Sequence, residues 1–377
     1  MMKTVPAGAL AGVRVIDASR VLGGPYCGQI LGDHGADVLK IEVAHGDDTR
    51  QWGPPFMGPN SAYFSGANRN KQTHILDLST PQGREALFEM LDTADVFVEN
   101  FKRSTLEKWG LTLESFRSRN PRLIHCRVSG FGSVGPYGDL PAYDPAVQAL
   151  SGIMSVNGNA QSGPLRVGLP VVDLTTGMSA VIGVLLALYE RTLSGVGQLV
   201  ETTLYGNALA MLHPHTSNYF SNGKNPVRTG NAHPNIYPYD CFETAEGLIY
   251  LAVGNDVQFK IFCAHVGLEP LVNDERFATS TQRHINRDAL KEILVQHLRT
   301  YHAKTLATEL IHKGVPCAPV QSVEEVLSDP HTKAQNLIVE LEPGYRGIAS
   351  PIMMSRTPPS YRYAPPTLPE TKDTSDD

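Results

Sequence analysis

The sequence contains few cysteines, and they do not occur in pairs. The five cysteines are scattered over 377 residues without a CxxC spacing, and no HExxH spacing occurs among the histidines. The sequence therefore has neither the ligand spacing of a common zinc site nor the pattern of a disulfide framework. We expect no metal, and the scattered thiols favour a reducing, intracellular compartment.

An excess of positive charge is also missing. The chain has 32 Lys and Arg against 38 Asp and Glu, with a formal net charge of −6. A nucleic-acid-binding protein normally carries a strongly basic face, so we expect no nucleic-acid partner. The most apolar helical run, residues 177–189, falls short of the roughly 18 residues that cross a bilayer. The first residues lack the apolar core of a secretory signal. These absences predict a soluble, cytoplasmic protein without a membrane segment.

What is present is a repeated alternation of strand-like and helix-like segments. Residues 13–17 read as a buried strand, a glycine turn and a helical stretch follow, and residues 36–42 read as a second strand. This βαβ pattern recurs through residues 73–78, 80–93 and the strand-like run ADVFVEN. Such alternation predicts an α/β fold with a doubly wound, mostly parallel sheet.

The character of the chain changes after residue 213. Residues 214–238 are rich in Asn, Gly, Pro and His and predict a linker. Residues 239–330 then predict a smaller α+β domain, in keeping with a length that exceeds one usual hydrophobic core. The acidic end, TKDTSDD, is typical of disorder.

The first βα turn contains glycines but not a dinucleotide fingerprint. Gly23, Gly24 and Gly28 have the spacing GGxxxG rather than GxGxxG, so we expect no nicotinamide cofactor. A plain tight turn explains these glycines as well as a ligand site does. Glycines before a helix nevertheless allow phosphate to approach free backbone amides.

Asp173 is the candidate nucleophile. It follows a strand-like run, VGLPVV, and precedes a strongly apolar helix. An aspartate there is commonly only an N-cap. The functional alternative is a carboxylate at a strand-to-helix elbow, kept ionised by helix-end amides and able to attack without a general base. No GxSxG elbow of a serine hydrolase is present.

Seven stretches in the same order resemble the class III coenzyme A (CoA) transferases. Among them are RVIDASRVLGGPYCGQILGDHGADVLKIE, VVDLTTGMSAVIGVLLALYERTLSGVGQ and GNAHPNIYPYDCFETAEG. The resemblance spans nearly the whole chain, from about Leu10 to Pro366. It implies that residues 1–213 and 331–377 form one large CoA-binding domain, and that two chains interlock as a homodimer.

The resemblance also implies the chemistry and its residues. Asp173 aligns with the catalytic aspartate, which takes the acyl group and then CoA itself as an aspartyl-CoA thioester. Acyl-CoA and a free carboxylic acid are the substrates, with CoA as the only cofactor. The implied CoA contacts are Val21, Leu22, Gly23, Leu76, Asp77, Leu78, Ser79, Asn100, Phe101, Lys102 and Lys108. Positions near the acyl group are Trp52, Tyr143 and Gly254, the last at a lid.

Two alternatives within the same scaffold are an acyl-CoA racemase or isomerase and a thioester hydrolase. The racemases that this scaffold resembles use a histidine in an HD dipeptide, whereas this chain has Tyr143 and Asp144. A tyrosine with a pKa near 10 is a poor base for an α-proton, which favours the transferase. The strings around Gly23 and Arg50 look most like the succinyl-CoA:dicarboxylate subgroup. Arg50 or Arg166 would then pair with a distal carboxylate, or serve as an ordinary structural salt-bridge partner.

Overall fold

The computed structural model describes residues 8–342 and 344–369, so the predicted disorder of residues 371–377 lies outside the described part. The chain divides into two compact units. Unit 1 comprises Met1–Ser151, Val167–Met211 and Pro330–Asp377, and unit 2 comprises Gly152–Arg166 and Leu212–Asp329.

These bounds differ from the expected domains in two places. The whole of the expected linker, residues 214–238, belongs to unit 2, and so does the separate segment 152–166. Hydrogen bonds explain why the two segments stay together. The amide of Gly230 donates to the carbonyl oxygen of Gly158 at 2.8 Å, and the Arg228 side chain donates to the carbonyl oxygens of Ser155 and Asn159.

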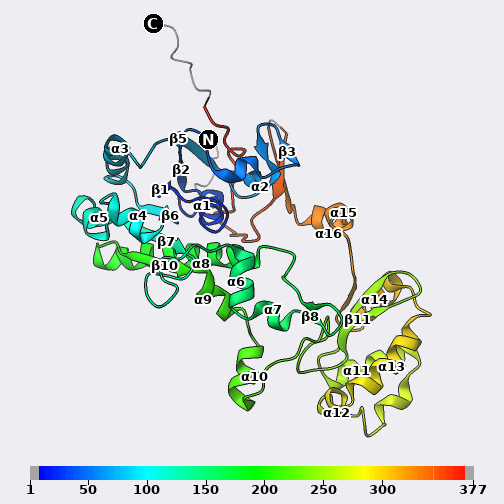
Figure 1. Cartoon of the computed structure of the whole chain (residues 1–377). Coiled ribbons are helices and arrows are strands. Elements are labelled where there is room, and N and C mark those ends of the chain that lie inside the picture. Colours follow the sequence, from blue (N-terminus) through cyan, green and yellow to red (C-terminus); the bar gives the residue numbers. More distant parts are fainter. Residues whose placement is uncertain (1–7, 343, 370–377) are drawn as a thin grey trace. The chain divides into compact units, whose positions relative to one another are not determined.

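Unit 1 is built on a six-stranded sheet in which every pair of neighbours is parallel (Figure 1). The strand order is β10-β7-β6-β1-β2-β5. This confirms the α/β class and the parallel sheet. The strands are β1 (Arg14–Asp17), β2 (Asp37–Glu42), β5 (Lys71–Ile75), β6 (Val96–Glu99), β7 (Ile124–Ser129) and β10 (Leu199–Thr203).

Helices cover both faces of this sheet. On one face, α3 (Pro81–Leu91), α4 (Arg103–Lys108) and α5 (Leu113–Arg119) pack their apolar side chains against Ile16, Ile41 and Phe97 of the strands. On the other face lie α1 (Gly23–Asp33) and α8 (Val171–Ser194), which pack against each other (Figure 1). The remaining helices of unit 1 are η1 (Asp48–Gln51), α2 (Ala62–Ser65), α6 (Asp144–Leu150), α9 (Leu204–Ala210) and α16 (Pro330–Ala334).

Helices α1 and α8 approach closely because both carry glycine at the crossing. A β-carbon at Gly177 would lie 2.6 Å from the carbonyl oxygen of Gly23, which is too close for any side chain. The same crossing brings the start of α8 next to the start of α1. A β-carbon at Gly23 would lie 3.6 Å from the Asp173 Oδ1 atom.

Helix α8 is longer than the apolar run of the sequence indicated. It extends over 24 residues and is followed by Gly195, whose φ of 78° is the left-handed conformation of a helix C-terminus. By length and composition alone it is long and apolar enough to cross a membrane, and 44% of its most apolar window is buried in the chain. The expectation that the most apolar helical run falls short of the length that crosses a bilayer was therefore wrong, because the helix extends beyond residues 177–189 at both ends.

Two short hairpins complete unit 1. One is β3 (Phe56–Met57) with β4 (Asn60–Ser61), and the other is β14 (Ile338–Leu341) with β15 (Tyr345–Ile348). The chain after β15 is fastened to the first βαβ unit by hydrogen bonds. Arg362, for example, donates to the carbonyl oxygens of Gly32 and Ala36 at 3.1 and 2.6 Å.

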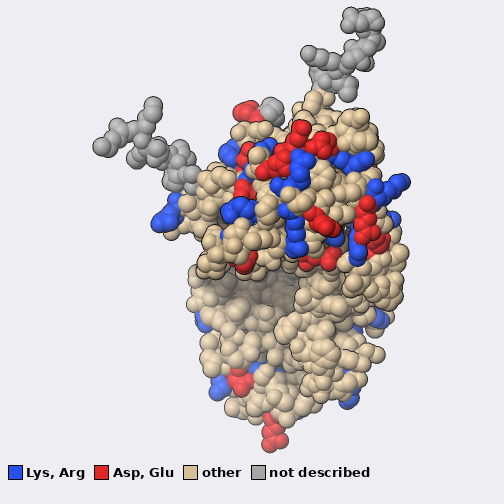
Figure 2. All heavy atoms as spheres, turned by 90° about the vertical axis from the view of Figure 1, so that its left-hand side faces the viewer, with Lys and Arg blue, Asp and Glu red and all other residues tan. Residues whose placement is uncertain are grey.

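Charged side chains on the surface of unit 1 alternate in sign. On the upper part of the face in Figure 2, basic and acidic side chains are intermixed. Ion pairs account for part of this pattern, such as those of Arg119 in α5 with Glu85 and Asp92. An anionic ligand must therefore be bound by local groups rather than by a broad positive field.

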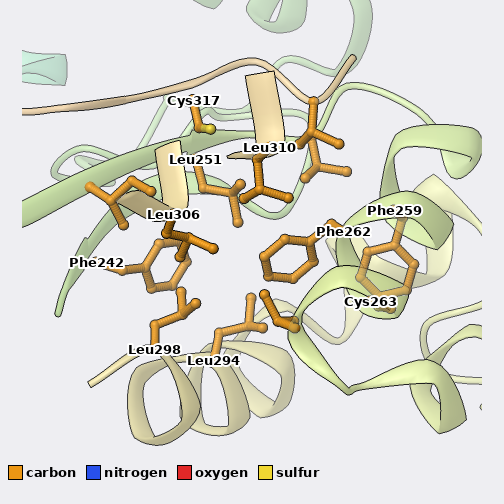
Figure 3. Close-up of a cluster of buried hydrophobic side chains, with 14 of the residues drawn as sticks. Phe242, Leu251, Phe259, Phe262, Cys263, Leu294, Leu298, Leu306, Leu310 and Cys317 are labelled. Atoms are coloured by element: carbon orange, nitrogen blue, oxygen red, sulfur yellow. The ribbon is translucent and has the colours of Figure 1, made fainter. Parts of the chain in front are cut away.

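Unit 2 contains an antiparallel sheet of three strands with helices, which agrees with the expected α+β class. Phe242, Leu251, Phe262, Leu294 and Leu310 belong to its buried core (Figure 3). Its strands are β11 (Tyr239–Glu243), β12 (Leu248–Ala252) and β13 (Cys317–Pro319), with the hairpin β8 (Gly158–Asn159) and β9 (Gly163–Pro164). Its helices are α7 (Ile153–Val156), α10 (His215–Asn222), α11 (Asp256–Val266), η2 (Glu269–Val272), α12 (Ser280–Ile285), α13 (Arg287–Leu298), α14 (Ala303–His312) and α15 (Val323–Ser328).

Candidate active site

A cavity of about 720 Å³ lies at the carboxyl-terminal ends of the six parallel strands of unit 1. The chain runs from β1 outward to β2 and β5, and then to β6, β7 and β10 on the other side. Ligands of open α/β sheets bind at this edge, near the point where the strand order reverses. The wall of the cavity consists of residues 18, 20–23, 41–43, 46–48, 76–79, 100–103, 105, 109, 127–133, 139–143, 173, 201 and 204.

Asp173 lies in the wall of this cavity and is 9% exposed. It is the third residue of α8, and the helix begins at Val171 after the N-cap residue Pro170. Residues 165–170 form no strand. The expected strand-to-helix elbow was therefore wrong, although the position at the start of a helix was right.

The amides at the start of α8 are occupied by a different carboxylate. Asp144 Oδ2 accepts hydrogen bonds from the backbone amides of Val172 and Asp173 at 2.8 and 3.1 Å. Its Oδ1 atom accepts from the side chain of Gln148 at 2.6 Å. Asp144 thus caps α8 from outside the helix, and the amides expected to hold Asp173 ionised are bound to Asp144 instead.

The environment of Asp173 raises its pKa. Burial has the largest effect, and the nearby charge of Asp144 adds to it, so that the pKa rises to about 7. Within residues 8–342 and 344–369, no group donates a hydrogen bond to the Asp173 carboxylate. The expectation that helix-end amides hold this carboxylate ionised was wrong, because those amides donate to Asp144. At neutral pH both forms are populated, and the ionised form is a more basic oxygen nucleophile than an ordinary aspartate.

The predicted contacts at the first turn lie directly beside Asp173. Val21, Leu22 and Gly23 all line the cavity. Val21 adopts a φ of 71°, a left-handed conformation that costs a β-branched residue roughly 1–3 kcal/mol.

Most of the other predicted CoA contacts also line the cavity. Residues 76–79 follow β5, and residues 100–102 follow β6. Asp77 shapes its own turn, because its Oδ1 atom accepts a hydrogen bond from the amide of Ser79 at 2.9 Å. Lys108, at the end of α4, is exposed and does not line the cavity.

Three aromatic side chains, Trp52, Tyr63 and Tyr143, form a row of neighbouring rings beside the cavity. Tyr143 lines the cavity, and its ring centroid is 6.4 Å from that of Trp52, which lies outside the cavity wall. The ring of Tyr63 lies 5.2 Å from that of Trp52. Burial, followed by the charges of Asp173 and Asp144, raises the pKa of Tyr63 to about 12. The sequence reading missed Tyr63, because no local pattern marks a residue that only the tertiary fold brings to the site.

The sequence reading also missed part of the wall beyond β7. Ser129 ends that strand, residues 130–133 (GFGS) directly follow it, and all five line the cavity. A glycine-containing turn after a buried strand is the signal that drew attention to Gly23. The same signal after β7 was sufficient to predict that these residues line the cavity. Arg127 lines the cavity too, with its Nε atom 2.8 Å from Glu99 Oε1. Arg20, Lys102 and Arg103 are the other basic residues of the wall.

Arg50 is a structural residue, not a free partner for a substrate carboxylate. It is 2% exposed and donates to both carboxylate oxygens of Glu42 at 2.6 and 2.8 Å. Its remaining contacts are Asn60, the carbonyl oxygen of Pro366 and the ring of Phe64. The suggestion that Arg50 binds a distal carboxylate was therefore wrong, because its donors are already used.

Two predicted residues belong to unit 2, whereas the cavity lies in unit 1. They are Arg166 and Gly254. Gly254 follows β12, and its amide donates to Gln258 Oε1 at 2.8 Å. Within the part of the chain that the structure describes, His, Cys, Asp and Glu form no group of three or more that could hold a metal ion.

The chain belongs to CoA-transferase family III, whose family model matches residues 10–372. It is therefore a CoA-transferase. The succinate–glutarate CoA-transferase of Agrobacterium fabrum is 42% identical over 96% of this chain and 93% of that protein. The acetyl-CoA:oxalate CoA-transferase of Acetobacter aceti is 39% identical over 90% of this chain and 88% of that protein. The human succinyl-CoA:glutarate CoA-transferase is 34% identical over 88% of this chain and 76% of that protein.

The fold is that of this family as well. A crystal structure of a CAIB/BAIF family protein from Brucella suis superposes with a TM-score of 0.86. It is 38% identical and covers 96% of this chain and 97% of its own. CoA thioesters are thus co-substrates of this chain, as the resemblance implied.

We predict that Asp173 makes folding stability depend on pH. Its pKa is raised from 3.8 to about 7, so the folded state holds the proton that the unfolded state loses between these values. The wild type should therefore lose stability relative to Asp173→Asn as the pH rises from about 4 to 7. The loss should be roughly 2–4 kcal/mol, at about 1.4 kcal/mol per pKa unit. Urea denaturation of both proteins at several pH values measures it.

The control for this experiment is Asp144→Asn. The amide oxygen still accepts from the start of α8, but the charge beside Asp173 is gone. In the Asp144→Asn background, the loss of folding stability that Asp173 causes between about pH 4 and 7 should be smaller than in the wild type. An equal free-energy difference between wild type and Asp173→Asn at every pH would contradict a raised pKa.

Proposed function

We propose that this chain transfers CoA from an acyl-CoA to a free carboxylic acid through covalent intermediates on Asp173. The observation that carries the proposal is the position of Asp173. Its carboxylate is nearly buried, accepts no hydrogen bond from the described residues, and lies in the wall of the cavity beside Gly23. A nucleophile without hydrogen-bonded partners retains its basicity and is sheltered from water.

The chemistry proceeds by exchange of one thioester for another. An Asp173 oxygen attacks the thioester carbonyl and forms a carbon–oxygen bond. The carbon–sulfur bond then breaks, which releases CoA as a thiolate and leaves a mixed anhydride between Asp173 and the acyl group. The thiolate then attacks the Asp173 carbonyl, releases the donor acid and forms the aspartyl-CoA thioester. The acceptor carboxylate reverses both steps, so the carboxylate of Asp173 is regenerated. The overall exchange neither takes up nor releases a proton.

We place the CoA between the first turn and the segments after β5 and β6. Residues 21–23 line the cavity, and Gly23 lies next to Asp173. The narrow pantetheine arm of CoA would lie along this backbone with its thioester at Asp173. Arg20, Lys102 and Arg103 supply positive charge for the phosphates. The rings of Phe101 and Trp109, whose centroids are 5.6 Å apart, offer an apolar surface at the same end of the cavity.

The racemase and hydrolase alternatives receive less support from the cavity wall. None of the described residues that line it is a histidine. Tyr143 occupies the position of the racemase base, and its neighbour Asp144 is engaged with α8. Removal of an α-proton therefore lacks a base of suitable pKa beside the nucleophile.

We predict that hydroxylamine captures Asp173 as a hydroxamate after incubation with an acyl-CoA donor, because acyl anhydrides and thioesters react with it. Mass spectrometry of the peptides locates the adduct. Asp48, another carboxylate of the cavity wall, serves as the internal control and should remain unmodified. Asp173→Ala should lose both the adduct and at least about 10³-fold in kcat. Retention of transfer activity by Asp173→Ala sinks the proposal.

For the substrates, we propose succinyl-CoA as donor and a dicarboxylate as acceptor. The support is the chemistry named for the relatives, since glutarate and oxalate are both dicarboxylates. Arg50 does not supply the distal contact, because its donors are occupied. The basic residues of the cavity wall are the remaining candidates in unit 1.

We predict that kcat/KM is at least about tenfold higher for glutarate than for pentanoate, which has the same carbon count but one carboxylate. The measurement is the initial rate of acyl-CoA formation, with succinyl-CoA, acetyl-CoA and formyl-CoA as donors. Equal values for the two acceptors would refute the dicarboxylate specificity but leave the transfer chemistry intact.

We further propose that α8 forms the interface of an interlocked homodimer. Six large apolar side chains at helical spacing along α8 are exposed in the single chain, with Leu186, Tyr189 and Leu193 at 65, 69 and 76%. A contiguous apolar face of this kind is typical of a protein interface. A second copy is the occupant that the family resemblance favours, and covering the face would keep the chain soluble in the cytoplasm. The six residues are Met178, Ile182, Leu185, Leu186, Tyr189 and Leu193.

We predict that two differently tagged preparations form no mixed dimers when they are mixed and diluted to nanomolar concentration. Interlocked chains cannot separate without unfolding, whereas dimers that only touch exchange subunits. Affinity capture followed by mass spectrometry detects mixed dimers, and co-expression of both tagged chains provides the positive control. A monomer in the native protein, or mixed dimers without unfolding, would contradict interlocking.

A further inference from the structure

Val21 is the one aliphatic residue among the non-glycine residues with positive φ in the described chain. The other three are Asn70, Asp139 and Asn336, and Asn and Asp tolerate this conformation well. Val21 is β-branched, and a residue of this type returns to negative φ unless its surroundings prevent it. The structure must therefore contain a device that holds Val21.

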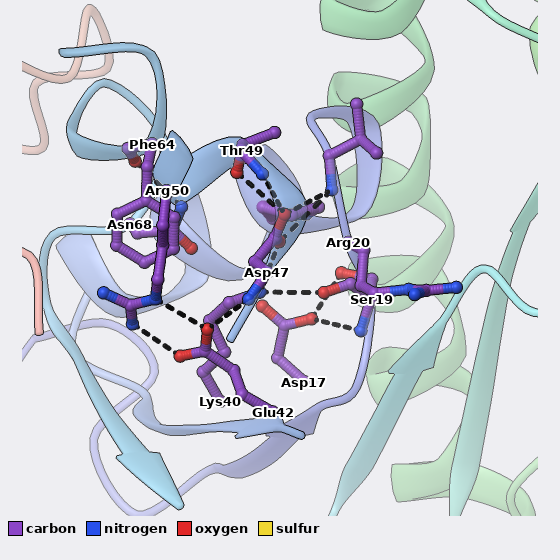
Figure 4. Close-up of polar contacts among 12 residues, drawn as sticks. Asp17, Ser19, Arg20, Lys40, Glu42, Asp47, Thr49, Arg50, Phe64 and Asn68 are labelled. Carbon is purple, nitrogen blue, oxygen red and sulfur yellow. Dashed lines mark hydrogen bonds and ion pairs between the residues drawn. The ribbon is translucent and has the colours of Figure 1, made fainter. Parts of the chain in front are cut away.

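Side chains of Lys40 and Asp47 bind backbone groups before and at Val21. Figure 4 shows both side chains next to Ser19. The carbonyl oxygen of Ser19 accepts a hydrogen bond from Lys40 Nζ at 2.8 Å. The amide of Val21 itself lies 3.3 Å from Asp47 Oδ2 and 3.5 Å from Oδ1. Lys40 and Asp47 form an ion pair at 3.2 Å, and both side chains are fully buried.

Asn100 closes the same turn from the side of β6. Its Oδ1 atom accepts from the amide of Arg20 at 3.0 Å, and its Nδ2 atom donates to the Arg20 carbonyl oxygen at 2.7 Å. Three consecutive residues before α1 are thus bound by side chains from elsewhere. Of these contacts, the one from Asp47 reaches Val21 directly.

Asp47 is rigidly fixed by its own partners. Its Oδ1 atom accepts from the amide and the hydroxyl of Thr49 at 3.0 and 2.8 Å, and its amide donates to Glu42 at 2.8 Å. Burial alone would raise the pKa of Asp47, but Lys40 and the donors of Thr49 outweigh burial and lower it. Asp47 is therefore an ionised, immobile acceptor for the Val21 amide.

The turn held in this way forms part of the candidate active site. Val21 and Gly23 line the cavity, and Gly23 lies against Asp173. A rotation of Val21 to negative φ would displace this stretch of backbone. The fraction of molecules with the correct turn then sets the apparent affinity for a ligand that binds there.

We propose that the buried Asp47–Lys40 pair is a positioning device that holds Val21 in the left-handed conformation and so preforms the turn against which acyl-CoA binds. The proposal rests on the proposed function for the location of acyl-CoA. It assigns no contact with substrate to Asp47 or Lys40. Their effect on binding passes through the backbone conformation of one residue.

The test is a double-mutant cycle with Asp47→Asn and Val21→Gly, read as the Kd for CoA and as KM and kcat for succinyl-CoA. Asp47→Asn should raise Kd and KM at least tenfold and change kcat less than threefold, because saturating ligand selects the correct turn. In the Val21→Gly background the same substitution should raise Kd less than threefold, since glycine needs no support at positive φ. An equal fold-change in both backgrounds overturns the proposal.

Asp33→Asn is the matched control. Asp33 is also a buried carboxylate in an ion pair, with Arg69 at 2.6 Å, but it does not contact the turn. This variant should lower the denaturation midpoint without raising the Kd for CoA, and Val21→Gly should not rescue it. If Asp47→Asn fails to fold, Asp47→Glu keeps the charge but displaces the acceptor, and the same rescue is expected.

Failure of the proposed function gives a different result. A wild-type chain that neither binds CoA nor transfers it refutes the function, and the cycle is then read as shifts of the denaturation midpoint alone. Val21→Gly should still reduce the shift caused by Asp47→Asn. Wild-type CoA binding combined with an unchanged effect of Asp47→Asn in the glycine background refutes only the positioning device.

Discussion

The crossing of α1 and α8 sets the geometry on which the rest of the site depends. Glycine at positions 23 and 177 lets the two helices approach until a β-carbon at Gly177 would meet a backbone oxygen. This contact brings Asp173 of α8 beside the turn that opens α1. A nucleophile on one helix is thereby joined to a binding turn on another, and neither helix alone would form the site.

Charge distribution then gives the two neighbouring carboxylates different roles. The Asp144 carboxylate accepts hydrogen bonds from two backbone amides and one side-chain amide, whereas none of these groups donates to the Asp173 carboxylate. Burial and the charge of Asp144 raise the pKa of Asp173 to about 7. A capping carboxylate thus stabilises the helix, and the same charge makes its neighbour a more basic nucleophile.

The buried polar residues around the first βαβ unit stabilise the backbone rather than bind substrate. Arg50, Lys40 and Asp47 are buried and satisfied by one another and by the backbone. Asp47 also lines the cavity, whereas Arg50 and Lys40 do not, and all three fix the segments that form its wall. Breaking a buried pair of this kind is costly because one charge is left without a partner. Arg50, which the sequence offered as a partner for a substrate carboxylate, therefore acts here through the shape of the backbone.

The local pattern of the sequence predicted the parallel sheet and the order of its strands along the chain, and the resemblance to the CoA-transferases pointed to the cavity segments at the ends of β1, β5 and β6. Hydrophobic alternation and glycine turns are local signals, and the parallel sheet gathers all strand ends at one edge. It also singled out Asp173. Only the tertiary structure decided that Arg50 is occupied, that Tyr63 lies near the nucleophile, and that residues 152–166 and 214–238 join one unit. It alone decided the pKa of Asp173, because that value depends on burial and on a carboxylate 29 positions away in the chain.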